Sequence, residues 1–130
     1  MNSIKIEASG MYLPKRVIEN DYFKEIFNID ENWIFKRTGI KKRYWAEEET
    51  RAELAIKAVE NLTQKNEFDL QKIGLIIVAS TNFEDAMPSI SFEIQKKFNI
   101  ENCMCMDILA GCRGYINALD IARKYIELDE

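Results

Sequence analysis

The sequence contains no histidine, and this absence limits the chemistry that the chain can carry out. Histidine is the usual general base and a common metal ligand near neutral pH, so neither role has its usual residue here. No apolar run approaches the roughly 20 residues that span a bilayer, and the first ten residues lack the basic and apolar regions of a secretory signal. We therefore expect a cytoplasmic protein that does not contact a membrane.

Positive charge and cysteine are also scarce. The 18 basic residues are outnumbered by 22 acidic ones, which argues against nucleic acid as a partner because its binding depends on cationic contacts to phosphate. The three cysteines, Cys103, Cys105 and Cys112, are an odd number without the spacing of a disulfide framework, so we expect free thiols. Cys103 and Cys105 could form a Cys-x-Cys metal clip, but no histidine or second cysteine pair completes it. We predict core packing for both and no metal site.

The 130 residues have the length and composition of one folded domain. In the first half, Asn20 is a plausible helix N-cap, and Asp30 and Gly39 bound a second helix. Thr50 and Glu53 have the spacing of a capping box, in which each side chain binds a free N–H of the first turn. The predicted elements are a strand at 4–8 that breaks at Gly10, helices at 20–27, 30–39 and 50–62, and a weak strand at 41–46.

The second half alternates between buried strands and helices. Residues 74–80 form a continuous apolar run rich in β-branched residues, which is typical of a strand buried on both faces. The further predicted elements are a helix opened by Pro88 that runs to 98, a strand at 103–110 and a helix from about 112 to 128. The inner face of the last helix is predicted to carry Tyr115, Ala118, Leu119, Ala122, Tyr125 and Ile126. This alternation predicts an α/β fold with a mostly parallel sheet covered by helices on both faces.

Cys112 lies where the strand at 103–110 meets the last helix, between Gly111 and Gly114. Ligands of open α/β sheets bind beyond the carboxyl ends of the strands. The free N–H groups of a helix start favour negative charge, so a reactive thiolate is one interpretation of this position. The two glycines would let the backbone bend and a substrate carbonyl approach. Ordinary small-residue packing at the turn is the alternative.

Four longer stretches resemble a known family in order and spacing: "GMYLPKRVIEN", "NWIFKRTGIKKRYWA", "GLIIVASTNFEDAMPSISFEIQKKF" and "CMDILAGCRGYINALDIARKYI". Together they are similar to β-ketoacyl-acyl carrier protein synthase III, one of the thiolase-like condensing enzymes. The resemblance implies that residues 1–130 form the amino-terminal part of a thiolase-like domain whose second half is absent. It also implies a transferase of fatty acid biosynthesis and lipid metabolism.

The resemblance implies a role for each matching residue. Cys112 matches the nucleophile that takes an acyl group from acyl-CoA before decarboxylative condensation with malonyl-carrier protein, and its backbone N–H matches part of the oxyanion hole. Trp33 and Arg37 match residues that bind the adenine and the nucleotide end of coenzyme A. Met87 matches a position that lines the partner's acyl pocket in a homodimer. Acyl-CoA would be a substrate, and no cofactor would be bound permanently.

Other interpretations of these residues stay open. Without the resemblance, Trp33 could be a core residue, and Arg37 belongs to a basic run at 36–43 that is typical of a solvated face or of a surface for an acidic carrier protein. Gly111, Arg113 and Met87 depart from the family's usual residues, which leaves the starter substrate open. We expect the chain alone to be acylated at most and not to condense, because it lacks the histidine and asparagine of the family's second half. We also expect self-association through exposed apolar surface. The alternatives are a related acyltransferase of secondary metabolism and a non-catalytic dimerising or carrier-binding module.

Overall fold

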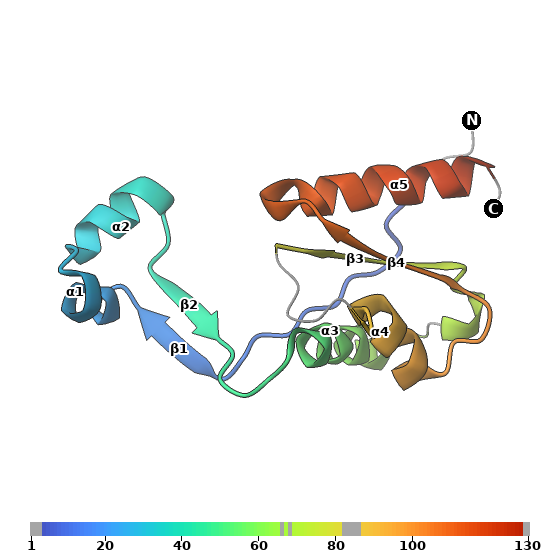
Figure 1. The fold of residues 1–130 in the computed structure, drawn as a ribbon, viewed down its shortest axis with the longest axis horizontal. Coiled ribbons are helices and arrows are strands. Elements are labelled where there is room, and N and C mark those ends of the chain that lie inside the picture. The colour runs from blue at the N-terminus through green and yellow to red at the C-terminus, as the bar shows by residue number, and fades with distance from the viewer. Residues whose placement is uncertain (1–3, 66, 68, 82–86, 129–130) are drawn as a thin grey trace. The chain divides into compact units, whose positions relative to one another are not determined.

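The computed structural model describes residues 4–65, 67, 69–81 and 87–128 (Figure 1). The chain divides into two compact units, one formed by Met1–Met11 with Arg51–Glu130 and the other by Tyr12–Thr50. Each unit is described by itself. In the part of the chain that is described, no helix combines the length and apolar character needed to cross a membrane.

The smaller unit, Tyr12–Thr50, is built on an antiparallel pair of strands. β1 (Arg16–Glu19) pairs with β2 (Lys42–Trp45), and α1 (Asp21–Phe27) and α2 (Glu31–Thr38) lie between them in the sequence. α2 begins and ends as predicted: the Asp30 carboxylate accepts a hydrogen bond from the Asn32 N–H at 3.1 Å, and Gly39 adopts a left-handed φ of 71°. The weak strand prediction at 41–46 is confirmed by β2, whereas β1 was not predicted.

Asn20 precedes α1 as predicted, but its side chain does not cap the helix. Its Nδ2 donates to the carbonyl oxygen of Ile40 at 2.7 Å, and its Oδ1 accepts from the Arg43 guanidinium at 2.6 Å. Arg43 also lies over the Phe23 ring, 4.7 Å from the centroid. The capping prediction is wrong because this buried side chain ties the start of α1 to the segment around β2. Arg43 is therefore a structural residue, and the basic run is not solvated throughout.

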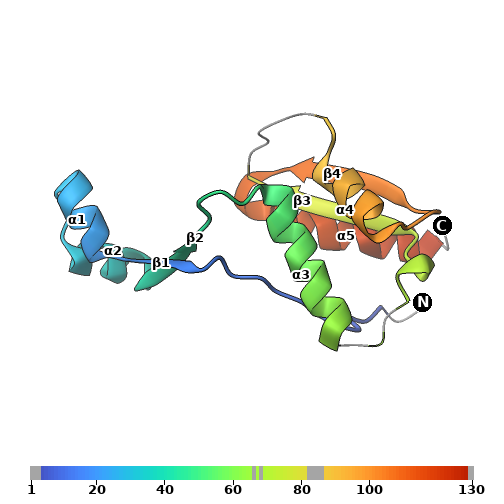
Figure 2. The same ribbon diagram turned by 90° about the horizontal axis from the view of Figure 1, so that it is seen from below.

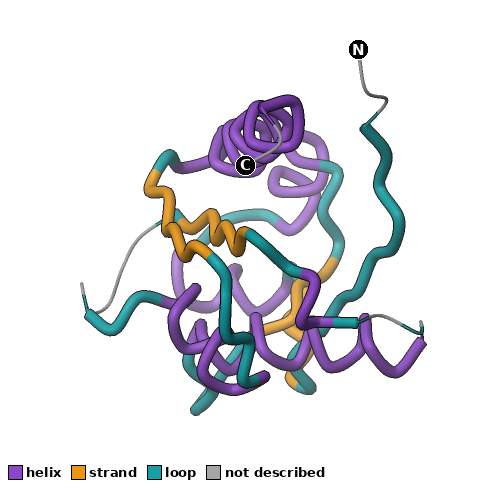
Figure 3. The backbone as a smooth tube through the Cα atoms, turned by 90° about the vertical axis from the view of Figure 1, so that its right-hand side faces the viewer, coloured by secondary structure: helices purple, strands orange, loops and turns teal. Residues whose placement is uncertain are grey.

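The larger unit has three layers. β3 (Leu75–Ser80) and β4 (Met104–Leu109) form a parallel pair in the register Leu75↔Met104 to Ser80↔Leu109. α3 (Arg51–Lys65) and α4 (Ile90–Phe98) cover one face of this pair, and α5 (Gly114–Leu128) covers the other (Figures 1 and 2). The end-on view shows the strands between these two helical layers (Figure 3). This arrangement confirms the predicted α/β class with helices on both faces of a parallel sheet.

The predicted strand at 4–8 is wrong for the described residues, because residues 4–10 form no ladder. An alternating pattern becomes a strand only when a neighbour accepts its hydrogen bonds, and Ile6 is 75% exposed instead. The segment is anchored at its end by close packing on α3. A Cβ atom at Gly10 would overlap the carbonyl oxygen of Ala58, so only glycine fits.

α4 is held in place by a carboxylate from the neighbouring strand. The helix begins at Ile90, with Ser89 in the N-cap position, rather than at Pro88 as predicted. The Ser89 side chain makes no capping bond. Instead, the two Asp107 carboxylate oxygens accept the Ile90 N–H at 2.9 Å and the Ser91 N–H at 3.0 Å. This bond pair fixes the start of α4 against β4, and Ser91 is fully buried there.

Candidate active site

Cys112 lies in a 3₁₀ turn, η2 (Gly111–Arg113), which joins β4 to α5. The sequence placed the thiol at the beginning of the helix, whereas α5 itself begins two residues later at Gly114. Gly111 has a φ of 52°, a conformation that favours glycine, and so allows the sharp bend that was predicted. The Cys112 side chain is exposed.

Gly114 has a different role from the one expected. A Cβ atom there would lie 3.1 Å from the Cβ of Ala79, and Gly114 is buried. The glycine therefore lets the first turn of α5 pack on β3, and the space beside it is filled by protein. Of the two glycines that flank Cys112, Gly111 is the one with open space beside it, because a Cβ there would have no neighbour within 4 Å.

A cavity of about 700 Å³ opens between α5 and β3, and Cys112 lines it. The six residues predicted for the inner face of α5 all line this cavity. They are not a packed core, however, since the Tyr115 side chain is 63% exposed and that of Ile126 is 50% exposed. From Cys112 to Ile126 the helical path is roughly 20 Å long, so the cavity offers an extended apolar surface with a thiol at one end.

The polar groups near the thiol come from the carboxyl ends of the two strands. Ser80 is the last residue of β3 and Thr81 comes directly after it, whereas Gly111 lies two residues beyond the end of β4. The first turn of α5 carries no acidic side chain, so its free N–H groups and dipole favour negative charge that develops nearby. Arg113 does not line the cavity.

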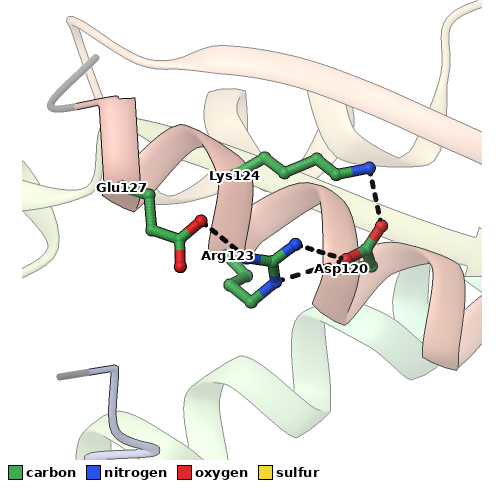
Figure 4. A network of polar contacts seen from close by, with 4 residues as sticks. All are labelled: Asp120, Arg123, Lys124 and Glu127. Carbon is green, nitrogen blue, oxygen red and sulfur yellow. Dashed lines mark hydrogen bonds and ion pairs between the residues drawn. The ribbon is translucent and has the colours of Figure 1, made fainter. Parts of the chain in front are cut away.

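The opposite face of α5 is strongly polar. Arg123 bridges Asp120 at 3.0 Å and Glu127 at 2.6 Å, and Lys124 reaches the second Asp120 oxygen at 2.8 Å (Figure 4). The hydrogen bonds that Asp120 accepts lower the pKa of its carboxyl, and the bond from Lys124 has a larger effect than the bond from Arg123. None of the four residues lines the cavity, so α5 is amphipathic with its apolar side toward β3.

Trp33 and Arg37 are one turn apart on α2, in the smaller unit. The Arg37 guanidinium lies 4.7 Å from the centroid of the Trp33 ring, and the Trp33 side chain is 50% exposed. This exposure contradicts the alternative that Trp33 is a core residue. The two side chains predicted to bind coenzyme A are therefore brought together, with part of the indole available to a ligand.

Met87, the remaining predicted site residue, is 74% exposed and directly precedes Pro88. Residues 82–86, which lead to it, lie outside the described residues. Its predicted place in an acyl pocket stays a prediction.

Sequence reasoning missed Asp107, which positions α4. The available signal was a single carboxylate inside the apolar run 103–110, because a buried charge requires hydrogen-bond partners. The two other cysteines also differ from expectation, since both are half-buried rather than in the core. Burial is the main cause that raises the pKa of the Cys105 thiol to about 11.

Comparisons with known proteins agree with this geometry. No family model matches the chain. It is 38% identical over 126 residues to β-ketoacyl-[acyl-carrier-protein] synthase III of Streptococcus sanguinis, covering 97% of this chain and 39% of that protein. It is 40% identical over 125 residues to the Acholeplasma laidlawii protein of the same name, covering 95% and 40%. The chain thus spans about two fifths of the length of these curated relatives.

Solved structures of the same kind share the fold. The synthase III from Aquifex aeolicus superimposes with a TM-score of 0.88 at 34% identity, covering 96% of this chain and 41% of that one. The Thermus thermophilus structure gives a TM-score of 0.86 at 36% identity, with 95% and 39% covered. The resemblance and the thiolase-like α/β fold predicted from the sequence are both confirmed.

Proposed function

We propose that this chain, which is similar along its length to the amino-terminal part of β-ketoacyl-[acyl-carrier-protein] synthase III, carries the nucleophilic cysteine of such a condensing enzyme in fatty acid biosynthesis. The observation that carries the proposal is the position of Cys112, exposed at a strand–helix junction and lining an apolar cavity. A thiol sealed within packed side chains could not take up an acyl group. This one is open to solvent and to the cavity.

In the first step, the Cys112 sulfur attacks the carbonyl carbon of an acyl-CoA thioester. The new carbon–sulfur bond forms as the bond to coenzyme A breaks, and the thiol proton ends on the departing coenzyme A sulfur. Negative charge develops on the carbonyl oxygen, and backbone N–H groups around η2 and the start of α5 suit that charge. The apolar wall of α5 offers the acyl chain a place out of water.

The Trp33–Arg37 pair supports coenzyme A as the donor. An exposed indole face stacks on a flat base, and a guanidinium pairs with phosphate through charge-assisted hydrogen bonds. Both features occur in the nucleotide part of coenzyme A, which we propose as a substrate portion and not as a permanently bound cofactor.

Condensation requires a second step. In that step malonyl-carrier protein loses CO₂, and the resulting carbanion attacks the acyl thioester and releases the Cys112 thiolate. The sequence contains no histidine to stabilise this carbanion, so we propose that the 130 residues alone accept an acyl group but do not condense it. The malonyl-carrier protein remains the proposed second substrate of the whole enzyme.

The proposed setting is a cytoplasmic homodimer. Exposed apolar side chains favour association: on α5 alone, Tyr115, Ile116 and Leu128 are each more than 60% exposed. Met87 is proposed to extend toward the partner's acyl pocket, and its 74% exposure leaves it free to do so. No observation on the described residues favours secondary metabolism or a non-catalytic module over this proposal.

The test is acylation of Cys112 followed by intact mass spectrometry. The protein is incubated with acetyl-CoA, and the expected result is one added acetyl group that hydroxylamine removes, as a thioester requires. Cys112→Ala should abolish the adduct, whereas Cys103→Ser should retain it. Absence of an adduct, or an adduct that survives Cys112→Ala, would overturn the proposal.

A further inference from the structure

The Cys-x-Cys pair at the start of β4 brings two thiols together. The Sγ atoms of Cys103 and Cys105 are 3.9 Å apart, and the Cys105 Sγ lies 3.7 Å from the carbonyl oxygen of Ser91 on α4. Alternate residues of a strand point to the same face, so both thiols face α4. Each side chain is half-buried, which holds the pair in place yet leaves it within reach of solvent.

The separation of the sulfur atoms suits a bridging ion better than a disulfide. A disulfide bond is about 2.05 Å long, so the sulfur atoms would have to move together by nearly 2 Å. Two metal–thiolate bonds of about 2.3 Å place the sulfur atoms about 4.6 Å apart when the S–metal–S unit is straight, so the sulfur atoms would have to separate by roughly 0.7 Å from the observed 3.9 Å. An ion can therefore sit between the two sulfur atoms with little change in the strand.

The number and kind of ligands select the ion. Structural zinc takes four ligands, and within the described ranges no group of three or more His, Cys, Asp and Glu side chains is placed to hold a metal. Two thiolates without further ligands suit a soft ion that accepts low coordination. Among biological metals that ion is Cu(I), for which thiolate ligands are selective.

We propose that Cys103 and Cys105 form a two-coordinate binding site for Cu(I). Binding replaces the two thiol protons, which pass to solvent, and leaves one copper bis-thiolate unit with a single negative charge. The oxidation states of copper and sulfur do not change. The site is separate from Cys112, because the pair lies at the amino end of β4 and Cys112 beyond its carboxyl end, roughly 20 Å away along the strand.

The test is a Cu(I) titration of the protein carrying Cys112→Ser, which removes the exposed thiol from the measurement. The titration is anaerobic, with bicinchoninate as a chromophoric competitor. We expect one Cu(I) per chain, and a loss of affinity of about tenfold or more when either Cys103→Ser or Cys105→Ser is added. Met104→Leu is the matched control: it changes the residue between the ligands, whose side chain is 49% exposed, and should leave the affinity unchanged.

A second measurement does not depend on the folding of any variant. In the unmodified protein, Cu(I) should protect Cys103 from iodoacetamide while Cys112 continues to react, as mapped by peptide mass spectrometry. The proposal is overturned if Cys103 is alkylated equally with and without Cu(I). It is also overturned if both serine variants bind Cu(I) as tightly as their parent.

Discussion

Removal of the Asp107 carboxylate should destabilise the larger unit, because this carboxylate holds the start of α4. Its two oxygens accept the Ile90 and Ser91 N–H groups at 2.9 and 3.0 Å, and the Ser89 side chain does not take over this function. Hydrogen bonds to a charged group contribute about 1.5–3 kcal/mol each, and loss of a helix N-cap alone costs about 1 kcal/mol. Since part of each bond is recovered by water, we expect about 2–4 kcal/mol for Asp107→Ala.

Asp107→Asn should cost about half as much, because an amide offers one oxygen and turns its NH₂ group toward the other N–H. Urea unfolding followed by circular dichroism measures both changes, with an unchanged slope showing that the unfolding transition remains comparable. Hydrogen exchange adds a local readout, since the amides of Ile90 and Ser91 should lose protection first. Asp120→Asn, on the exposed face of α5, is the control and should have little effect. If Asp107→Ala were as stable as the unmodified protein, the assignment of this carboxylate as the cap of α4 would be wrong.

Three further predictions follow from single contacts. Gly10→Ala should destabilise the protein by about 1–3 kcal/mol through overpacking against α3, as urea unfolding would show. By NMR, the Asp120 carboxyl should titrate with a pKa below its ordinary value of 3.8, and Lys124→Gln should raise this pKa. The ionised Asp120 carboxylate therefore stabilises the folded protein at pH values above its ordinary pKa, and this stabilisation is lost as the pH falls through the lowered pKa of the folded state. At the proposed coenzyme A site, Arg37→Ala should weaken binding by roughly tenfold in calorimetry, a change of about 1.4 kcal/mol.

Each of these has a matched control. Gly74→Ala adds a Cβ atom with no neighbour within 4 Å and should be tolerated, so equal costs at both glycines would contradict the packing argument. If the pKa of Asp120 were the same in the Lys124→Gln variant, the ion pair with Lys124 would not be the cause of the lowered pKa. Lys24→Ala removes a cation from α1 in the same unit. If it lowered the affinity for coenzyme A as much as Arg37→Ala does, the effect of Arg37 would be one of net charge and not of a specific contact.

Local rules predicted the helices well. α2 begins after Asp30 and ends before Gly39 because a capping carboxylate and a left-handed glycine act within a few residues of their targets. β3 and β4 were also predicted from their apolar runs, although no residue of either strand is fully buried in the structure. The inner face of α5 was correctly selected by its periodicity, although it borders a cavity and is not fully buried.

Errors arose where distant residues decide the structure. Residues 4–8 have the alternation of a strand but no hydrogen-bonded neighbour, while β1 forms because β2 lies beside it. Asn20 has the composition of a cap, yet Ile40 and Arg43 occupy its polar atoms. In both cases the competing partner lies about twenty residues or more away in the sequence, where local patterns carry no information.

The order of the elements from residue 20 onward, the absence of histidine chemistry and the choice of Cys112 as the reactive candidate came from the sequence alone, because each depends on residue type and short spacing. The cavity beside that thiol and the two hydrogen bonds that Asp107 accepts from the start of α4 came only from the tertiary structure. Side chains on separate elements meet through packing of the whole unit, and that packing depends on all of its contacts at once.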